Sequence, residues 1–244
     1  MTANEVKPEI DGATRMFQAW EQEHGIRVSP SIHFTGGEPF LYDRFWDVVA
    51  YARGKGYGVA VMTNGCLVTE EDAQKALGLG ISDIQVSLEG PPNLHISIRG
   101  KGSFNAASKG VEYLVAAGNR VSANVTLSRI NINKIEETTE IAKEMGFYSI
   151  GFSRIVPCGR GKALIDHLLT PQELKSAYQK IISLGGVGAG SPPASIRSIC
   201  RRRSTSSGAT SAGSAASRRC SAAGAGDARS RGTGAATISR QSCR

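Results

Sequence analysis

The sequence predicts an α/β protein in which parallel strands alternate with helices, in the manner of a partial barrel. Strand-like segments and segments of helical periodicity follow one another in units of about 25–35 residues. Crossovers of that length connect parallel strands and place the helices outside the sheet. The length of 244 residues accommodates a partial barrel, because a complete one takes about 250. The five predicted strands are residues 30–35, 58–62, 82–87, 121–126 and 148–154.

The predicted helices have recognisable starts. Pro8 suits a first helical turn, Thr69 with Asp72 resembles a capping box, and Ser103 and Thr170 are suitable N-caps. The predicted helices are residues 8–24, 43–54, 69–78, 103–117, 132–145 and 170–184.

The order of these elements predicts a partial (β/α)6 TIM-like barrel. The chain opens on a helix rather than a strand, so we expect the first strand of the barrel to be missing. We expect residues 1–184 to form this core as one domain.

The C-terminal segment, residues 185–244, has a different composition. It contains ten Arg, one Asp and no Lys, Leu or aromatic residue. Its net charge is therefore +9, whereas the net charge of the whole chain is +8. The core is left with a charge of −1. Such a segment buries too little apolar surface to offset its ordering entropy, so we expect disorder. Its Arg, Ala, Gly and Ser content is typical of GC-rich codons and indicates out-of-frame translation; binding of nucleic acid by a basic tail is the alternative.

The cysteine content indicates a reducing compartment. The five Cys are widely spaced, with no C-x-x-C pair, which argues against a disulfide framework. No signal peptide and no run of about 18 apolar residues is present, so we expect a cytoplasmic protein without a membrane partner.

The first candidate site follows the strand at residues 30–35. Gly36, Gly37, Glu38 and Pro39 stand at its carboxyl end, where parallel α/β folds bind ligands. Two Gly let the backbone approach a ligand closely, and the Glu38 carboxylate can accept charge-assisted hydrogen bonds from an ammonium group. A simple Gly-Gly turn followed by a surface Glu fits the residues equally well.

Three further strand ends carry polar residues. Asn64 lies in a Thr-Asn-Gly turn, Ser87 ends the next strand and is followed by Arg99, and Asn124 lies within the fourth strand. Arg99 can clamp a carboxylate or form a surface ion pair, and Asn124 can contact a ligand or be a satisfied core amide. Because the carboxyl ends of parallel strands share one edge, the four motifs together indicate a single site more strongly than any one of them.

These motifs resemble those of the radical S-adenosylmethionine (radical SAM) superfamily, in its SPASM-type branch. The resemblance covers about 150 residues, from about Ser31 to Leu184. The matching segments are the GGEP motif at 36–39, the TNG turn at 63–65, an S-L-D-G-like end at 87–90 with Glu in place of Asp, an I-R-G-x-G-S-F run at 98–104, and segments 124–126 and 153–157.

The resemblance implies cofactors and residue roles. It implies that residues 36–39 bind the methionine amino group of S-adenosylmethionine, that Ser87 and Arg99 contact its ribose and carboxylate, and that Asn64 and Asn124 line the cofactor. Ile155 lies in the segment that the family places near the adenine. The resemblance also implies a [4Fe–4S] cluster.

The cluster motif C-x-x-x-C-x-x-C of the family has no counterpart in this sequence. The first cysteine is Cys66, beyond the expected position, so we expect no metal ligands in this chain and no cluster role for Cys66 or Cys158. We expect either an enzyme whose intact form cleaves S-adenosylmethionine to a 5′-deoxyadenosyl radical, or a truncated, non-catalytic product. The resemblance implies a peptide or small cofactor precursor as substrate and ferredoxin or flavodoxin as electron donor; we do not expect nucleic acid as a partner.

Overall fold

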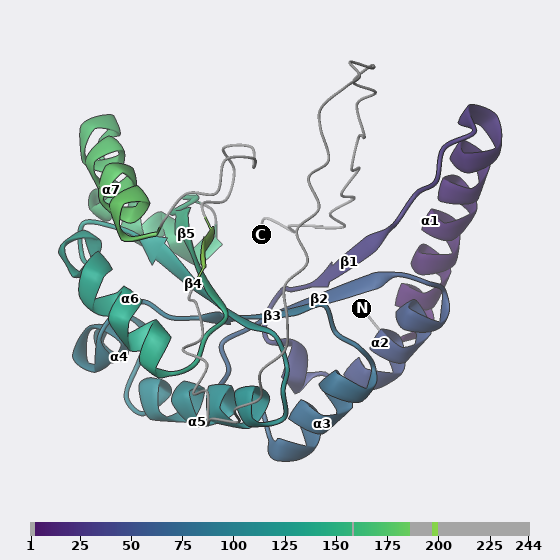
Figure 1. Cartoon of the computed structure of the whole chain (residues 1–244), viewed down its shortest axis with the longest axis horizontal. Coiled ribbons are helices and arrows are strands. Elements are labelled where there is room, and N and C mark those ends of the chain that lie inside the picture. Colours follow the sequence, from purple (N-terminus) through teal and green to yellow (C-terminus); the bar gives the residue numbers. More distant parts are fainter. Residues whose placement is uncertain (1–2, 158, 186–196, 200–244) are drawn as a thin grey trace, which may run out of the picture.

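The computed structural model describes residues 3–157, 159–185 and 197–199 and confirms the α/β prediction. Five parallel strands lie side by side in sequence order, which is the order that consecutive strand–helix–strand units produce. The sheet is strongly curved, and the helices lie along its convex side (Figure 1). The five strands are β1 (Ser31–Phe34), β2 (Gly58–Thr63), β3 (Asp83–Ser87), β4 (Val121–Leu127) and β5 (Ser149–Arg154).

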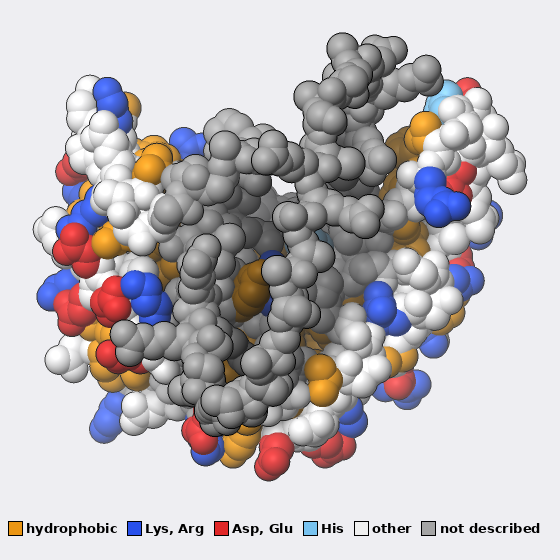
Figure 2. Space-filling view, in the orientation of Figure 1, with side chains coloured by type: hydrophobic (Ala, Val, Ile, Leu, Met, Phe, Trp, Pro, Cys, Tyr) orange, Lys and Arg blue, Asp and Glu red, His pale blue; other side chains and the backbone are white. Residues whose placement is uncertain are grey.

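The helices occupy the connections between the strands. α1 precedes β1 and contacts α2, and the outward-facing charged side chains of the helices mark the rim of the molecule (Figure 2). The α-helices are α1 (Ala3–His24), α2 (Phe45–Gly54), α3 (Glu70–Gly78), α4 (Pro92–Arg99), α5 (Ser103–Ala116), α6 (Ile135–Glu144) and α7 (Pro171–Leu184). The 3-10 helices are η1 (Pro39–Leu41), η2 (Ile132–Lys134) and η3 (Gly159–His167).

Several predicted helix ends are confirmed and two are wrong. Thr69 and Thr170 both form capping boxes. Pro8 lies inside α1 rather than in its first turn, because the helix already begins at Ala3. Ser103 is not an N-cap: left-handed Gly102 holds that position, and the Ser103 hydroxyl donates to the carbonyl of Gly100.

Three helical segments were not predicted: η1, α4 and η3. α4 follows Pro91 and begins with Pro92, a pair that is typical of a loop in a sequence. Proline is nevertheless well suited to a first helical position, where no N–H is needed.

The tail contains one described element. Residues 197–199 form a short strand, β6 (Arg197–Ile199), which pairs antiparallel with β5. The expectation of disorder throughout 185–244 therefore does not hold for these three residues, which pair with the edge of β5. The rest of that expectation concerns residues 186–196 and 200–244, which lie outside the described residues.

The two faces of the sheet differ in polarity. Side chains such as Ile84, Val86 and Ile150 point toward the helices and are at most 1% exposed. Because side chains alternate along a strand, Ser87, Asn124 and their neighbours point toward the concave face. The apolar residues therefore hold the helices in place, and the polar residues remain available for a ligand.

Candidate functional site

The Gly-Gly-Glu motif after β1 contacts the end of β2. Oε1 of Glu38 accepts a 2.6 Å hydrogen bond from the hydroxyl of Thr63, and Oε2 accepts a 2.8 Å bond from the backbone N–H of Asn64. Gly36 has a φ of +123°, in the region that favours glycine. The predicted motifs at residues 36–39 and 63–65 are thus joined directly by the Glu38 carboxylate.

The turn after β2 is packed tightly against α5. Gly65 has a φ of +77°, and a Cβ at this position would lie 2.9 Å from a methyl group of Val86. A Cβ at Gly110 of α5 would lie only 2.1 Å from the carbonyl oxygen of Gly65. Two glycines therefore let the helix and the turn approach each other, which fixes the position of Asn64.

A second contact between neighbouring strand ends is centred on Glu89, two residues after the end of β3. Its Oε1 accepts two hydrogen bonds from Arg99, at 3.0 Å from Nε and 2.6 Å from Nη2. Its Oε2 accepts a longer bond of 3.4 Å from the backbone N–H of Thr126 on β4. Glu89 is only 5% exposed, so Arg99 compensates a buried charge. The surface ion pair considered for Arg99 is thereby replaced by a largely buried one.

The side chain of His95 holds the backbone of Glu89 in place. Its Nδ1 accepts a hydrogen bond of 3.3 Å from the backbone N–H of Glu89, and its ring packs edge-on against Phe104. Burial, together with the positive charge of Arg99, lowers the pKa of His95 from 6.5 to about 4. His95 is therefore neutral near pH 7, as an acceptor at Nδ1 requires.

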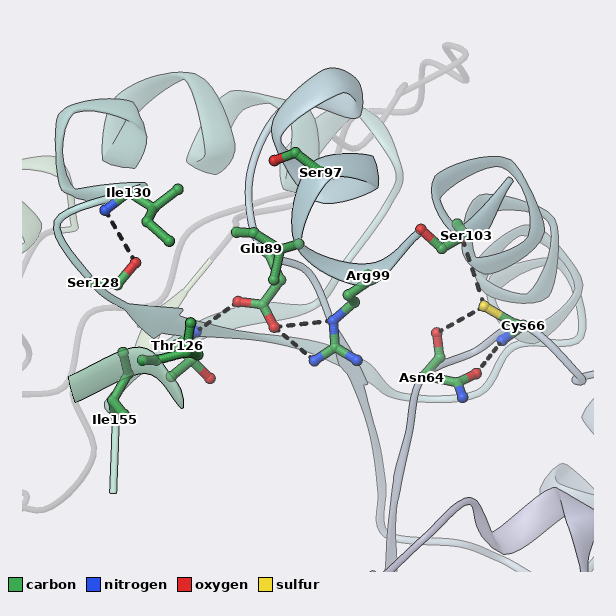
Figure 3. Close-up of a pocket in the computed structure, with 12 residues that line it drawn as sticks. Asn64, Cys66, Glu89, Ser97, Arg99, Ser103, Thr126, Ser128, Ile130 and Ile155 are labelled. Carbon is green, nitrogen blue, oxygen red and sulfur yellow. Dashed lines mark hydrogen bonds and ion pairs between the residues drawn. The ribbon is translucent and has the colours of Figure 1, made fainter. Parts of the chain in front are cut away.

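A cavity of about 680 Å³ opens between these strand ends (Figure 3). This volume is in the usual range for small-molecule and cofactor sites. One part of its wall is polar and another part is aliphatic. The lining residues are Asn64, Cys66, Glu89, Ser97, Ile98, Arg99, Ser103, Thr126, Ser128, Ile130, Ile155 and Leu164.

Three of the predicted site residues, Asn64, Arg99 and Ile155, line this cavity. Ser87 and Asn124 stand opposite each other in the β3–β4 register, and the amide of Asn124 donates to the hydroxyl of Ser153. The predicted residues that are absent from the wall are Gly36, Gly37, Glu38, Pro39, Ser87 and Asn124. Glu38 is nevertheless one hydrogen bond away from it, through Asn64.

Sequence reasoning missed several wall residues. Glu89 stood in a matching segment but was not selected as a site residue, although an acid ten residues before Arg99 was a usable signal. Thr126 and Ser128 continue the polar face of β4 beyond Asn124, and strand alternation could have indicated Thr126. Ser97 and Ile98 belong to α4, the helix that was not predicted.

Cys66 is half-buried in the wall. Its thiol contacts the carbonyl oxygens of Asn64 and Ser103, and burial followed by the negative charge of Glu38 raises its pKa. In the part of the chain that the structure describes, no group of three or more His, Cys, Asp or Glu side chains could hold a metal ion. These residues therefore do not fit a [4Fe–4S] cluster, which needs several thiolates.

Polar groups gathered around a cavity at the carboxyl edge of a curved parallel sheet are typical of an α/β barrel-like protein with a strand-end site. The particular family follows from comparison. Residues 18–150, more than half of the chain, match the Radical SAM superfamily, and the chain belongs to it.

Characterised relatives agree with this assignment. The chain is 29% identical over 157 residues to an AdoMet-dependent heme synthase of Nitratidesulfovibrio vulgaris, covering 64% of this chain and 42% of the relative. It is 32% identical over 157 residues to the mycofactocin maturase MftC of Mycolicibacterium smegmatis, covering 63% and 40%. The chain thus spans about two fifths of the length of these relatives.

Solved structures agree with the fold. Native anSMEcpe with bound AdoMet and the Kp18Cys peptide superimposes with a TM-score of 0.56 at 18% identity, over 64% of this chain and 46% of that one. Within the described residues, no helix has the length and apolar character needed to cross a membrane.

Proposed function

We propose that this chain forms the S-adenosylmethionine-binding part of a radical SAM enzyme of the SPASM-type branch. One observation carries the proposal: neighbouring strand ends bring a carboxylate, a guanidinium and amide groups to one edge of the sheet, around a cavity of cofactor size. S-adenosylmethionine offers complementary groups, namely an ammonium, a carboxylate, a ribose and an adenine.

Each group of the cofactor has a candidate partner. The Glu38 carboxylate and the backbone of Gly36 and Gly37 would hold the amino group, with Pro39 starting the short helix beside them. Arg99 would bind the carboxylate, because a guanidinium matches its planar geometry. The remaining assignments are Ser87 for the ribose, Asn64 and Asn124 for polar lining, and Ile155 for the adenine, beside the aliphatic side chains of the wall.

The activity of the whole protein is a further part of the proposal. In radical SAM chemistry a reduced [4Fe–4S] cluster supplies the electron that cleaves the cofactor; its ligands are not among the described residues. We propose a peptide or a tetrapyrrole-like cofactor precursor as substrate and ferredoxin or flavodoxin as electron donor. The names of the relatives, a heme synthase and a mycofactocin maturase, support this range of substrates.

The thiol of Cys66 provides a direct test of cofactor binding. Because Cys66 lines the cavity, bound S-adenosylmethionine should slow its alkylation by N-ethylmaleimide, measured at Cys66 by peptide mass spectrometry. The Glu38→Gln variant should lose most of this protection, whereas Glu112→Gln, a change at an exposed ion pair of α5, should keep it. Since Glu38 itself affects the thiol pKa, the ratio of rates with and without ligand is compared within each variant. An unchanged rate at millimolar cofactor would refute the proposal.

A non-catalytic product is the second candidate, and it is favoured by the absence of a metal-ligand group in the described part of the chain. Iron and acid-labile sulfide are measured after anaerobic reconstitution of the full chain. Less than about a tenth of a cluster per chain is expected for a non-catalytic product. Four irons and four sulfides per chain would contradict it.

A further inference from the structure

We propose that Glu89, held in place by His95, is a positioning residue that orients Arg99 for the carboxylate of the bound ligand. This inference rests on the proposed function, because it concerns the same cavity. It adds two residues that do not themselves have to touch the ligand. It also assigns a role to a buried histidine, His95.

The first step of the argument is the orientation of the guanidinium. Arg99 directs Nε and one N–H of Nη2 at a single oxygen of Glu89. Two N–H groups on Nη1 and one on Nη2 remain, and no described residue accepts a hydrogen bond from them. The guanidinium lies between Glu89 and Asn64 in the cavity wall, with its side chain 31% exposed (Figure 3). Its unused donors are therefore available to an anionic group in the cavity.

The second step is that Glu89 is fixed independently of Arg99. Its backbone N–H donates to Nδ1 of His95, and its backbone carbonyl accepts a 3.1 Å bond from the side-chain amide of Asn131. The same amide of Asn131 also donates to the carbonyl of Thr126, which joins the end of β3 to the end of β4. The backbone of Glu89 is thus anchored at the ends of two strands, and its Oε2 also accepts the backbone N–H of Thr126, so Arg99 meets a carboxylate that is already held in place.

The third step concerns His95. His95 is 1% exposed, and its Nε2 has no hydrogen-bond partner, so the one hydrogen bond that its ring makes within the described residues is the bond to Glu89. A buried polar ring is costly unless it contributes such a bond. Its contact with Phe104 connects α4 to α5 and fixes the ring plane. His95 therefore acts through Glu89 and not through the ligand.

Two effects of Glu89 on ligand binding oppose each other. Its negative charge reduces the attraction between Arg99 and an anion, and its hydrogen bonds hold the guanidinium in one geometry. The charge effect is weakened by solvent because Arg99 is partly exposed. The orientation effect is retained, because an arginine that is already ordered loses less conformational entropy when it binds. We expect orientation to dominate.

The test compares two probes that differ in one group, S-adenosylmethionine and its decarboxylated analogue. Dissociation constants of both are measured on the full chain by calorimetry, and the ratio of the two is the preference for the carboxylate. Wild type should prefer the carboxylate at least about tenfold, which corresponds to about 1.4 kcal/mol. Arg99→Ala should reduce the ratio to about one. Glu89→Gln should reduce it to about three or less, with little change for the decarboxylated compound.

The histidine variants separate positioning from general destabilisation. His95→Asn keeps an acceptor close to the position of Nδ1 and should retain the wild-type ratio within about twofold, whereas His95→Leu should reduce it as Glu89→Gln does. Glu112→Gln, which removes an exposed acid that does not line the cavity, is the matched control and should behave as wild type.

The outcomes distinguish the two proposals. If wild type binds neither probe, the proposed function fails. If wild type shows the preference and Glu89→Gln retains or increases it, Glu89 only neutralises Arg99 and the inference is overturned. Equal ratios for His95→Leu and wild type would likewise show that His95 does not position Glu89. Each variant is first shown to be folded by its melting curve in circular dichroism.

Discussion

Two strand-end acids, Glu38 and Glu89, perform the same local task in different surroundings. Glu38 follows β1 and accepts the backbone N–H of Asn64 at the end of β2. Glu89 follows β3 and accepts the backbone N–H of Thr126 at the end of β4. Each carboxylate thereby joins two neighbouring strands at the edge where the cavity opens.

The difference lies in burial and in the counter-charge. Glu89 is 5% exposed and is paired with Arg99, whereas the partners of the half-buried Glu38 are neutral donors. A buried carboxylate needs a cation, because desolvation of the charge is costly. An acid that keeps contact with solvent is stable with neutral donors and is free to receive a cationic ligand group. This difference supports the two proposed roles, in which Glu38 binds a cationic group of the ligand and Glu89 positions Arg99.

The largest expected effect follows from breaking the buried ion pair between Arg99 and Glu89. Arg99→Ala leaves the Glu89 carboxylate buried without a counter-charge and should lower the free energy of unfolding by about 3 kcal/mol. Urea titration followed by circular dichroism measures the change. The double variant Arg99→Ala/Glu89→Gln should recover more than half of the loss. A double variant no more stable than Arg99→Ala would show that the charge is not the cause.

Acid should destabilise the Glu89 region through His95. The unfolded chain binds a proton at this residue below pH 6.5, whereas folded His95 does so only below about 4. The free energy of unfolding should therefore fall as the pH decreases from 6.5 to 4, by about 3 kcal/mol in total.

Urea titrations at pH 7, 6 and 5 measure this dependence. His95→Asn does not titrate in this range and should show a slope flatter than wild type. Parallel slopes for the two proteins would contradict a neutral, buried His95.

A smaller effect is expected at the other acid. Glu38→Gln preserves shape but places an amide N–H₂ or a weaker neutral acceptor opposite Thr63 and the Asn64 N–H, and should cost about 1–2 kcal/mol. Because no buried countercharge is left unpaired, the loss should be smaller than for Arg99→Ala. Thermal unfolding with matched heating rates checks the order of the two effects, and a reversed order would break the comparison between the acids.

The smallest effect on stability is expected outside the candidate site, at the N-cap of α3. Thr69→Ala removes the hydroxyl that caps α3 and should cost about 1 kcal/mol, whereas Thr69→Ser should cost only a few tenths. Both are measured by urea titration. The protection of Cys66 by S-adenosylmethionine should be unaffected in these variants, and its loss would mean that the helix layer and the cavity are coupled.

Local signals explain how much of the fold was predictable. The five parallel strands were predicted because apolar strand patterns and turn residues recur along the chain, and the capping boxes at Thr69 and Thr170 lie within four residues. α4 was missed because Pro91 and Pro92 indicate a loop as readily as a helix start. The short strand β6 was missed because its pairing depends on a distant partner, the exposed edge of β5.

The candidate site was likewise predictable in part, from its local motifs. The motifs around Glu38 and Asn64 were visible as turn sequences, and their position at one edge followed from parallel topology. The acid ten residues before Arg99 was visible in the sequence, but the pairing of the two residues was not, since it depends on the direction in which α4 leaves β3.

The sequence by itself determined the alternation of strands and helices, the polar strand ends and the family to which they belong. These properties depend on residue order and on short-range periodicity. Only the tertiary structure decided that Arg99 faces a buried Glu89, that His95 supports this acid, and that Glu38 joins β1 to β2. The physical reason is that burial and hydrogen-bond partners arise from packing between elements, and a charge acquires its role from the surroundings into which the fold places it.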